Sequence, residues 1–168
     1  MEIVNRVEKS GLVTLDLGDF YPKATKHILD IKPWLFQGLL LKEKDFRQYL
    51  KEHYWQQYQD GMVNVICSSD AIIPNWAYML IAVELEGIAW AVSSGSENEL
   101  ITAGYLKNFY AHDFSIYKDK PVIMKGCGFG PTPPAVFIEA TARLKPFAKS
   151  VMFGEPCSTV PVYKRKKQ

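Results

Sequence analysis

The second half of the chain alternates short apolar runs with longer segments of helical character. Runs rich in β-branched residues predict strands at residues 62–67, 88–92, 121–125 and 150–153. Helical segments of ten or more residues separate these strands, at residues 74–85, 97–110 and 133–144, and Thr132 is a candidate cap for the last of them. This alternation is typical of parallel βαβ units.

The first sixty residues are less regular. Alternating apolar positions predict short strands at residues 11–17 and 27–31, and an amphipathic helix begins at Glu43. No internal repeat or linker stands out. We therefore predict an α/β fold with a mostly parallel open sheet of about four βα units and an N-terminal extension of short strands and one amphipathic helix. The expected single domain covers residues 1–168, as an extension (1–60), an α/β core (61–155) and a C-terminal loop with a basic tail (156–168).

Composition supports a globular protein. The chain has 168 residues, of which 48% are hydrophobic and 23% charged, and this balance excludes a disordered chain. Its three cysteines are too few for a disulfide framework. We expect a cytoplasmic protein without a membrane segment, because no apolar run approaches the ~20 residues that span a bilayer and the first residues do not resemble a signal peptide.

Charge argues against nucleic acid as a specific partner. The net charge of +2 includes the four cations of residues 164–167, which leaves −2 for the rest of the chain. A nucleic-acid-binding protein usually carries its cations on a folded face, whereas this basic run has the simplest interpretation as a solvated tail. Nucleic acid binding by the full chain, if any, is then expected to be weak, sensitive to salt and lost when residues 164–168 are removed.

The cysteines are the strongest candidates for functional residues. Cys67, Cys127 and Cys157 each lie at, or just beyond, the end of a predicted parallel strand. Ligands of open parallel sheets bind outside the carboxyl ends of the strands, so the three thiols are expected at one edge of the sheet. Cys67 and Cys127 also precede predicted helix N-termini, which favour negative charge.

Three thiolates at one edge predict a metal site. Soft sulfur ligands select zinc, copper(I) or an iron–sulfur cluster. Asp70 or a histidine (His27, His53 or His112) is available as a fourth ligand to zinc. The expected ligand-binding residues around the cysteines are Ser68, Ser69, Gly126, Gly128, Gly130 and Ser158.

The sequence leaves two alternatives to metal binding open. One is a thiol-dependent enzyme that uses one of these cysteines as its nucleophile. The other is a non-catalytic scaffold or interaction domain in which the cysteines only pack, since free cysteine is often buried. Whether the chain is an enzyme, which metal it binds and its oligomeric state stay open at this point.

Several stretches resemble a bacterial family that is known as domain of unknown function 2480. They are residues 1–7 (MEIVNRV), 30–38 (DIKPWLFQG), 67–78 (CSSDAIIPNWAY), 125–127 (KGC) and 154–161 (GEPCSTVP). The family has no assigned activity and no established catalytic residues. The resemblance implies an association with iron–sulfur metabolism and makes iron–sulfur assembly proteins the expected partners of the three-cysteine site.

Overall fold

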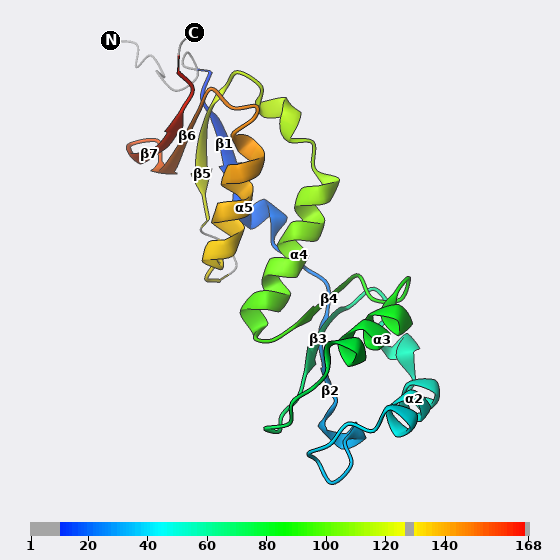
Figure 1. Cartoon of the computed structure of the whole chain (residues 1–168). Coiled ribbons are helices and arrows are strands. Elements are labelled where there is room, and N and C mark those ends of the chain that lie inside the picture. Colours follow the sequence, from blue (N-terminus) through cyan, green and yellow to red (C-terminus); the bar gives the residue numbers. More distant parts are fainter. Residues whose placement is uncertain (1–10, 127–129, 167–168) are drawn as a thin grey trace, which may run out of the picture. The chain divides into compact units, whose positions relative to one another are not determined.

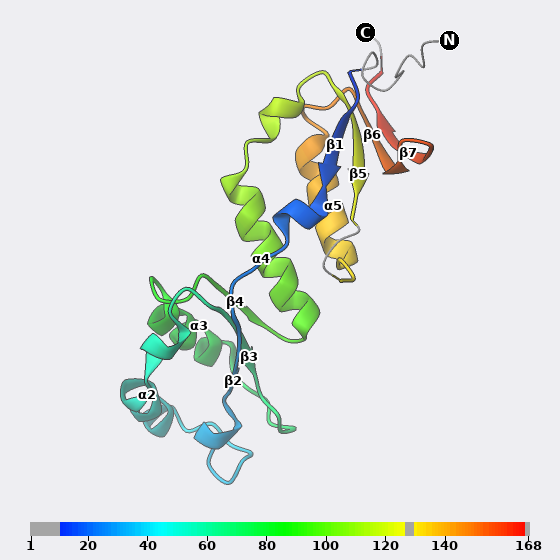
Figure 2. The same cartoon turned by 180° about the vertical axis from the view of Figure 1, so that it is seen from behind.

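The chain divides into two compact units, each with its own sheet. The computed structural model describes residues 11–126 and 130–166, and Figures 1 and 2 show it from opposite sides. The continuous unit comprises Pro22–Gly104, and the split unit comprises Met1–Tyr21 and Tyr105–Gln168. These bounds do not coincide with the expected division at residues 60 and 155, and the single domain stays a prediction.

The continuous unit contains a parallel sheet in the order β2-β3-β4. Its strands are β2 (Lys26–Asp30), β3 (Met62–Ile66) and β4 (Ala91–Ser94). The chain between β2 and β3 forms the 3-10 turn η2 (Lys32–Trp34), helix α2 (Glu43–Glu52) and the 3-10 turn η3 (Trp55–Tyr58). Helix α3 (Asn75–Leu85) connects β3 to β4.

Alternate residues of β3 face two different hydrophobic clusters. Val63 and Val65 belong to a cluster that includes Phe46 of α2 and Ile81 of α3. Met62 belongs to a second cluster, together with residues of β4 and of the first turns of α4 (Glu97–Ala111). The strand is therefore buried on both faces, which explains its nearly continuous apolar sequence.

The split unit contains a sheet in the order β1-β5-β6-β7. Its strands are β1 (Val13–Asp16), β5 (Pro121–Lys125), β6 (Ser150–Glu155) and β7 (Ser158–Lys164). The first three strands are parallel, and β7 returns antiparallel to β6 in a hairpin. The 3-10 turns η1 (Leu17–Phe20) and η4 (Phe114–Tyr117) follow β1 and α4, and helix α5 (Pro134–Leu144) lies over one face of the sheet (Figure 1).

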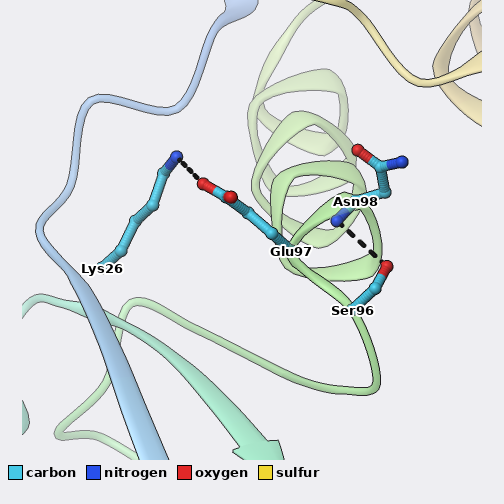
Figure 3. Close-up of polar contacts among 4 residues, drawn as sticks. All are labelled: Lys26, Ser96, Glu97 and Asn98. Atoms are coloured by element: carbon cyan, nitrogen blue, oxygen red, sulfur yellow. Dashed lines mark hydrogen bonds and ion pairs between the residues drawn. The ribbon is translucent and has the colours of Figure 1, made fainter.

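The start of α4 is held by side chains of the continuous unit (Figure 3). The hydroxyl of Ser96 accepts the N–H of Asn98 at 3.2 Å, while the N–H of Ser96 donates to the carboxylate of Glu99 at 2.8 Å. This reciprocal pair is a capping box. The ammonium of Lys26 lies 2.6 Å from the carboxylate of Glu97 and so ties β2 to the same helix end.

The two units repeat one structural plan. A constant shift of 59 residues carries the β3–β4 pair Met62 and Ala91 onto the β5–β6 pair Pro121 and Ser150. The same shift carries η3 onto η4 and the start of α3 onto the start of α5. Since pairing and connections agree at one shift without a gap, β3-α3-β4 and β5-α5-β6 are copies of one motif.

The first strand of each unit extends this correspondence. β1 pairs with β5 in the register in which β2 pairs with β3. Asp16 ends β1 and Asp30 ends β2, and each carboxylate accepts a backbone N–H two residues further on, at 2.9 Å and 3.0 Å respectively. The chain is thus an internal repeat in which one copy is inserted after the first strand of the other. The expectation of no internal repeat was wrong.

The α/β class with mostly parallel strands is confirmed. The predicted parallel strands, however, belong to two sheets, because β1 and β2 each pair with a different later strand. The strand expected at residues 88–92 lies at Ala91–Ser94. Pro133, and not Thr132, occupies the N-cap position of α5. Part of the expected C-terminal loop forms β7.

Candidate functional site

Cys67 follows the last residue of β3 and begins the loop that leads into α3. Asp30 at the end of β2 holds this loop, because its carboxylate accepts the N–H of Ser68 at 3.1 Å and the hydroxyl of Ser68 at 2.5 Å. Burial raises the pKa of Asp30, but the hydrogen bonds from Ser68 and from the N–H of Lys32 outweigh it and leave the pKa below its ordinary value.

A pocket of about 410 Å³ opens beside Cys67 at the carboxyl ends of β3 and β4. This is the edge where open parallel sheets bind their ligands, and the volume falls within the range of small-molecule sites. The pocket combines apolar walls with a thiol, hydroxyl groups and a phenol. Its lining residues are Val65, Ile66, Cys67, Ser69, Ala71, Ile73, Tyr78, Ser94 and Gly95.

Two polar side chains surround the half-buried Cys67. The sulfur lies 3.3 Å from the hydroxyl oxygen of Ser69, and the thiol can also donate to the carbonyl of Ser69 at 3.7 Å. Tyr78 comes from the first turn of α3. Burial raises the pKa of Tyr78 and the neighbouring Cys67 raises it further, so the phenol stays protonated and able to donate a hydrogen bond.

The side chain of Asn64, on β3, holds the end of β4, the second strand that borders the pocket. Its amide donates to the carbonyl of Gly95 at 2.8 Å, and its carbonyl accepts the hydroxyl of Ser93 at 3.2 Å. Asn64 is buried within an otherwise apolar strand, and both ends of its amide are satisfied. It therefore sets the position of the backbone at Gly95, which lines the pocket.

Cys157 does not share this sheet with Cys67. Cys157 is exposed in the turn between β6 and β7, which belong to the sheet of the split unit. Cys127 lies outside the described residues. The expectation of three thiols at one edge relied on a single sheet, and the presence of two sheets removes its basis. Within residues 11–126 and 130–166, no group of three or more His, Cys, Asp or Glu side chains is placed to hold a metal ion.

Two of the remaining predicted site residues lie beside Cys67, and the others lie elsewhere or outside the described residues. Ser68 and Ser69 lie beside Cys67, as described above. Asp70 is exposed and is not among the residues that line the pocket. Gly126, Gly130 and Ser158 belong to the split unit, and Gly128 lies outside the described residues.

The three histidines pack against aromatic rings. The rings of His27 and Tyr58 are 5.4 Å apart, and Nε2 of His53 lies 3.0 Å from the hydroxyl of the same tyrosine. His112 lies between Phe20 and Phe114, at 4.9 Å and 5.0 Å between ring centres. None of these histidines lines the Cys67 pocket.

Comparison with known proteins identifies the family of the chain. A family model described as "protein of unknown function (DUF2480)" matches residues 1–165. The chain belongs to this family. The match spans both units and therefore includes both copies of the repeat. No curated protein and no solved structure matches the chain. Among the described residues, no helix is long and apolar enough to cross a membrane.

Sequence reasoning missed Asn64 and Tyr78 as members of the site. A single amide within the apolar run of residues 62–66 was a usable signal, because a buried polar side chain needs partners that fix the local structure. Tyr78 gave no comparable signal, since an aromatic residue on an apolar helix is most simply part of the core.

Proposed function

We propose that the chain binds a small ligand in the Cys67 pocket and uses the thiol of Cys67 as its reactive group. The observation that carries this proposal is the position of Cys67 at the carboxyl edge of β3, inside a pocket that also offers the hydroxyl of Ser69. A thiol that only packs has no need of a pocket open to a ligand or of a polar neighbour.

The surrounding groups have separate roles in this proposal. The thiol of Cys67 adds across a polarised double bond of the ligand, so that sulfur bonds to the electrophilic atom, the π bond breaks and the thiol proton ends on the other atom of that bond, or the sulfur coordinates a soft metal within the ligand. The hydroxyl of Ser69 donates to the sulfur when the sulfur carries negative charge, and Tyr78 donates to the polar part of the ligand. Asp30 and Asn64 are positioning residues, because they hold the backbone at the two sides of the pocket.

A second proposal is that the cysteines bind zinc or an iron–sulfur cluster, with iron–sulfur assembly proteins as partners. It is supported by the fact that the two described cysteines are free thiols, one half-buried and one exposed. Free thiols also support a cytoplasmic location, where cysteines stay reduced.

The experiment that tests both proposals is native mass spectrometry combined with metal analysis of protein purified without oxygen. The first proposal predicts an adduct on the wild-type chain and on Cys157→Ser, and none on Cys67→Ser. The second predicts metal in the wild-type chain and a loss of metal in both variants. A chain with neither adduct nor metal after purification from cells, and with no Cys67-dependent adduct after exposure to a cell extract, contradicts both.

A further inference from the structure

The split unit carries most of the positive charge of the chain. It contains 13 lysines and arginines against 8 aspartates and glutamates, a net charge of +5, whereas the continuous unit contains 7 against 10, a net charge of −3. Such an asymmetry between parts of a chain is typical of proteins with an anionic partner. The four cations of residues 164–167 account for half of the difference of eight charges between the two units.

Cations gather where β5 and β6 begin and β7 ends. Lys120 precedes β5, Lys149 precedes β6 and Arg165 follows β7. Backbone hydrogen bonds of 2.9 Å join Lys149 to Lys120 and Arg165 to Lys149, so the three residues lie on adjacent strands at one edge of the sheet. Arg165 is therefore part of the folded sheet edge, and the interpretation of the basic run as a solvated tail was wrong for this residue.

Arg165 is held in place by groups on neighbouring loops. Its guanidinium pairs with the carboxylate of Asp119 and donates to the carbonyl of Phe147 at 2.6 Å. The exposed lysines of this edge make no ion pair within the part of the chain that the structure describes. They are Lys118, Lys120, Lys149, Lys164 and Lys166.

The internal repeat provides a control for whether the fold needs these cations. The backbone bond from Lys149 to Lys120 recurs in the continuous unit as a bond of 2.8 Å from Trp90 to Gly61. At the shift of 59 residues, Gln59 takes the place of Lys118. The continuous unit thus forms the same backbone arrangement without lysine at these positions.

A hollow of about 900 Å³ lies at this edge. Besides cations, its walls include the side chains of Pro146 and Phe147 and the hydroxyl of Ser115. An anionic partner that fits this hollow must therefore bring apolar as well as charged groups. The full set of lining residues is Ser115, Lys118, Asp119, Pro146, Phe147, Arg165 and Lys166.

We propose that this lysine-rich edge is a docking surface for a carboxylate-rich protein segment with an apolar side chain. Carboxylates pair with the exposed lysines, while the apolar side chain contacts Pro146 and Phe147. A single-stranded nucleic acid fits less well, because its bases need exposed aromatic platforms and, among the described residues that line the hollow, the one aromatic residue is the half-buried Phe147. The proposal concerns the split unit and does not depend on the Cys67 pocket.

Fluorescence anisotropy of the full chain with a labelled peptide tests the proposal. The peptide consists of about twelve aspartates and glutamates with two central leucines. We expect binding that weakens as salt rises from about 20 to about 150 mM, because exposed charges are screened over that range. Replacing the leucines by serine should weaken binding, since the contact with Pro146 and Phe147 is lost.

A matched pair of variants locates the surface. The triple variant Lys118→Gln, Lys120→Gln, Lys149→Gln should bind the peptide about tenfold more weakly. The control Lys23→Gln, Lys44→Gln, Lys51→Gln removes the same charge from exposed positions of the continuous unit and should change the affinity less than about twofold. Equal effects of the two variants, no binding at low salt, or tighter binding of duplex DNA or anionic vesicles than of the peptide would each overturn the proposal.

Discussion

Asp60 and Asp119 occupy the same position in the two copies of the internal repeat. Both adopt the left-handed backbone conformation, with φ of 57° and 59°. The N–H of Asp60 donates to the carbonyl of Ile88 at 2.8 Å, and the N–H of Asp119 donates to that of Phe147 at 3.0 Å. Each bond fixes the turn that leads into an inner strand of its sheet, β3 or β5. This agreement in an uncommon conformation supports a common origin of the two copies.

Substitution of Asp60 should reveal the cost of its backbone conformation. Because a β-branched side chain is strained at positive φ, Asp60→Val is expected to lower the free energy of unfolding by about 1–2 kcal/mol. Asp60→Gly should leave it unchanged or raise it slightly, since glycine adopts this conformation freely. Urea unfolding measures both. Equal stability of the valine and glycine variants would contradict the account of this turn.

Gly95, directly after β4, and Gly154, near the end of β6, provide a second matched pair. Gly154 has φ of 123°, and a Cβ atom there would lie 2.4 Å from the carbonyl oxygen of Ser158. Gly95 has φ of 112°, but its nearest neighbour would be the flexible Glu99 at 3.4 Å. We expect Gly154→Ala to destabilise the chain by about 1–3 kcal/mol, and Gly95→Ala by less. A larger loss of thermal stability in Gly95→Ala would contradict this steric explanation.

His112 should be replaceable without loss of stability. Its Nε2 is buried and has no hydrogen-bond partner among the described residues, and its ring packs against aromatic neighbours. An unsatisfied buried nitrogen costs about 1–3 kcal/mol, so His112→Phe is expected to raise the free energy of unfolding by about 1 kcal/mol. The equivalent change in the other copy, His53→Phe, removes a hydrogen bond to Tyr58 and should lower it. If chemical denaturation shows that His112→Phe lowers the free energy of unfolding and His53→Phe raises it, this account of the two histidines is wrong.

His53 also predicts how stability depends on pH. Burial lowers the pKa of His53 below its ordinary value of 6.5. Below pH 6.5 the unfolded chain therefore binds a proton that the folded chain does not, and stability should fall as the pH falls from there towards the lower pKa of the folded state. The variant His53→Phe should show a weaker dependence in this window when unfolding is measured at several pH values. If the stability of His53→Phe changes with pH as much as that of the wild-type chain, the lowered pKa of His53 is contradicted.

The local elements could be predicted from the sequence far better than their pairing. Strand β5 and helix α3 were found almost to the residue, because their apolar positions follow local periods. The split into two sheets depends on β1 pairing with β5 more than a hundred residues away, which no local pattern encodes. Strand β7 was missed because Pro161 interrupts its alternation.

The candidate site was predicted only in part, because local patterns do not encode how the strands pair. Cys67 was found because the end of a strand is a local feature, whereas its grouping with Cys127 and Cys157 required knowledge of the sheet order. The repeat had a readable signal at the shift of 59 residues. Pairs of identical residues there include Tyr58 and Tyr117, Asp60 and Asp119, Pro74 and Pro133, and Gly95 and Gly154.

The most direct test of the account is the alkylation rate of each cysteine in the folded chain, relative to its rate in urea. The sulfur of Cys67 lines an open pocket, and the hydroxyl of Ser69 at 3.3 Å is able to donate a hydrogen bond to the thiolate through which a cysteine reacts. We therefore predict that iodoacetamide, followed by mass spectrometry, modifies Cys67 faster in the folded than in the unfolded chain, while exposed Cys157 reacts at similar rates in both. A Cys67 thiol that folding slows would be a packing residue, and this result would contradict the proposed function.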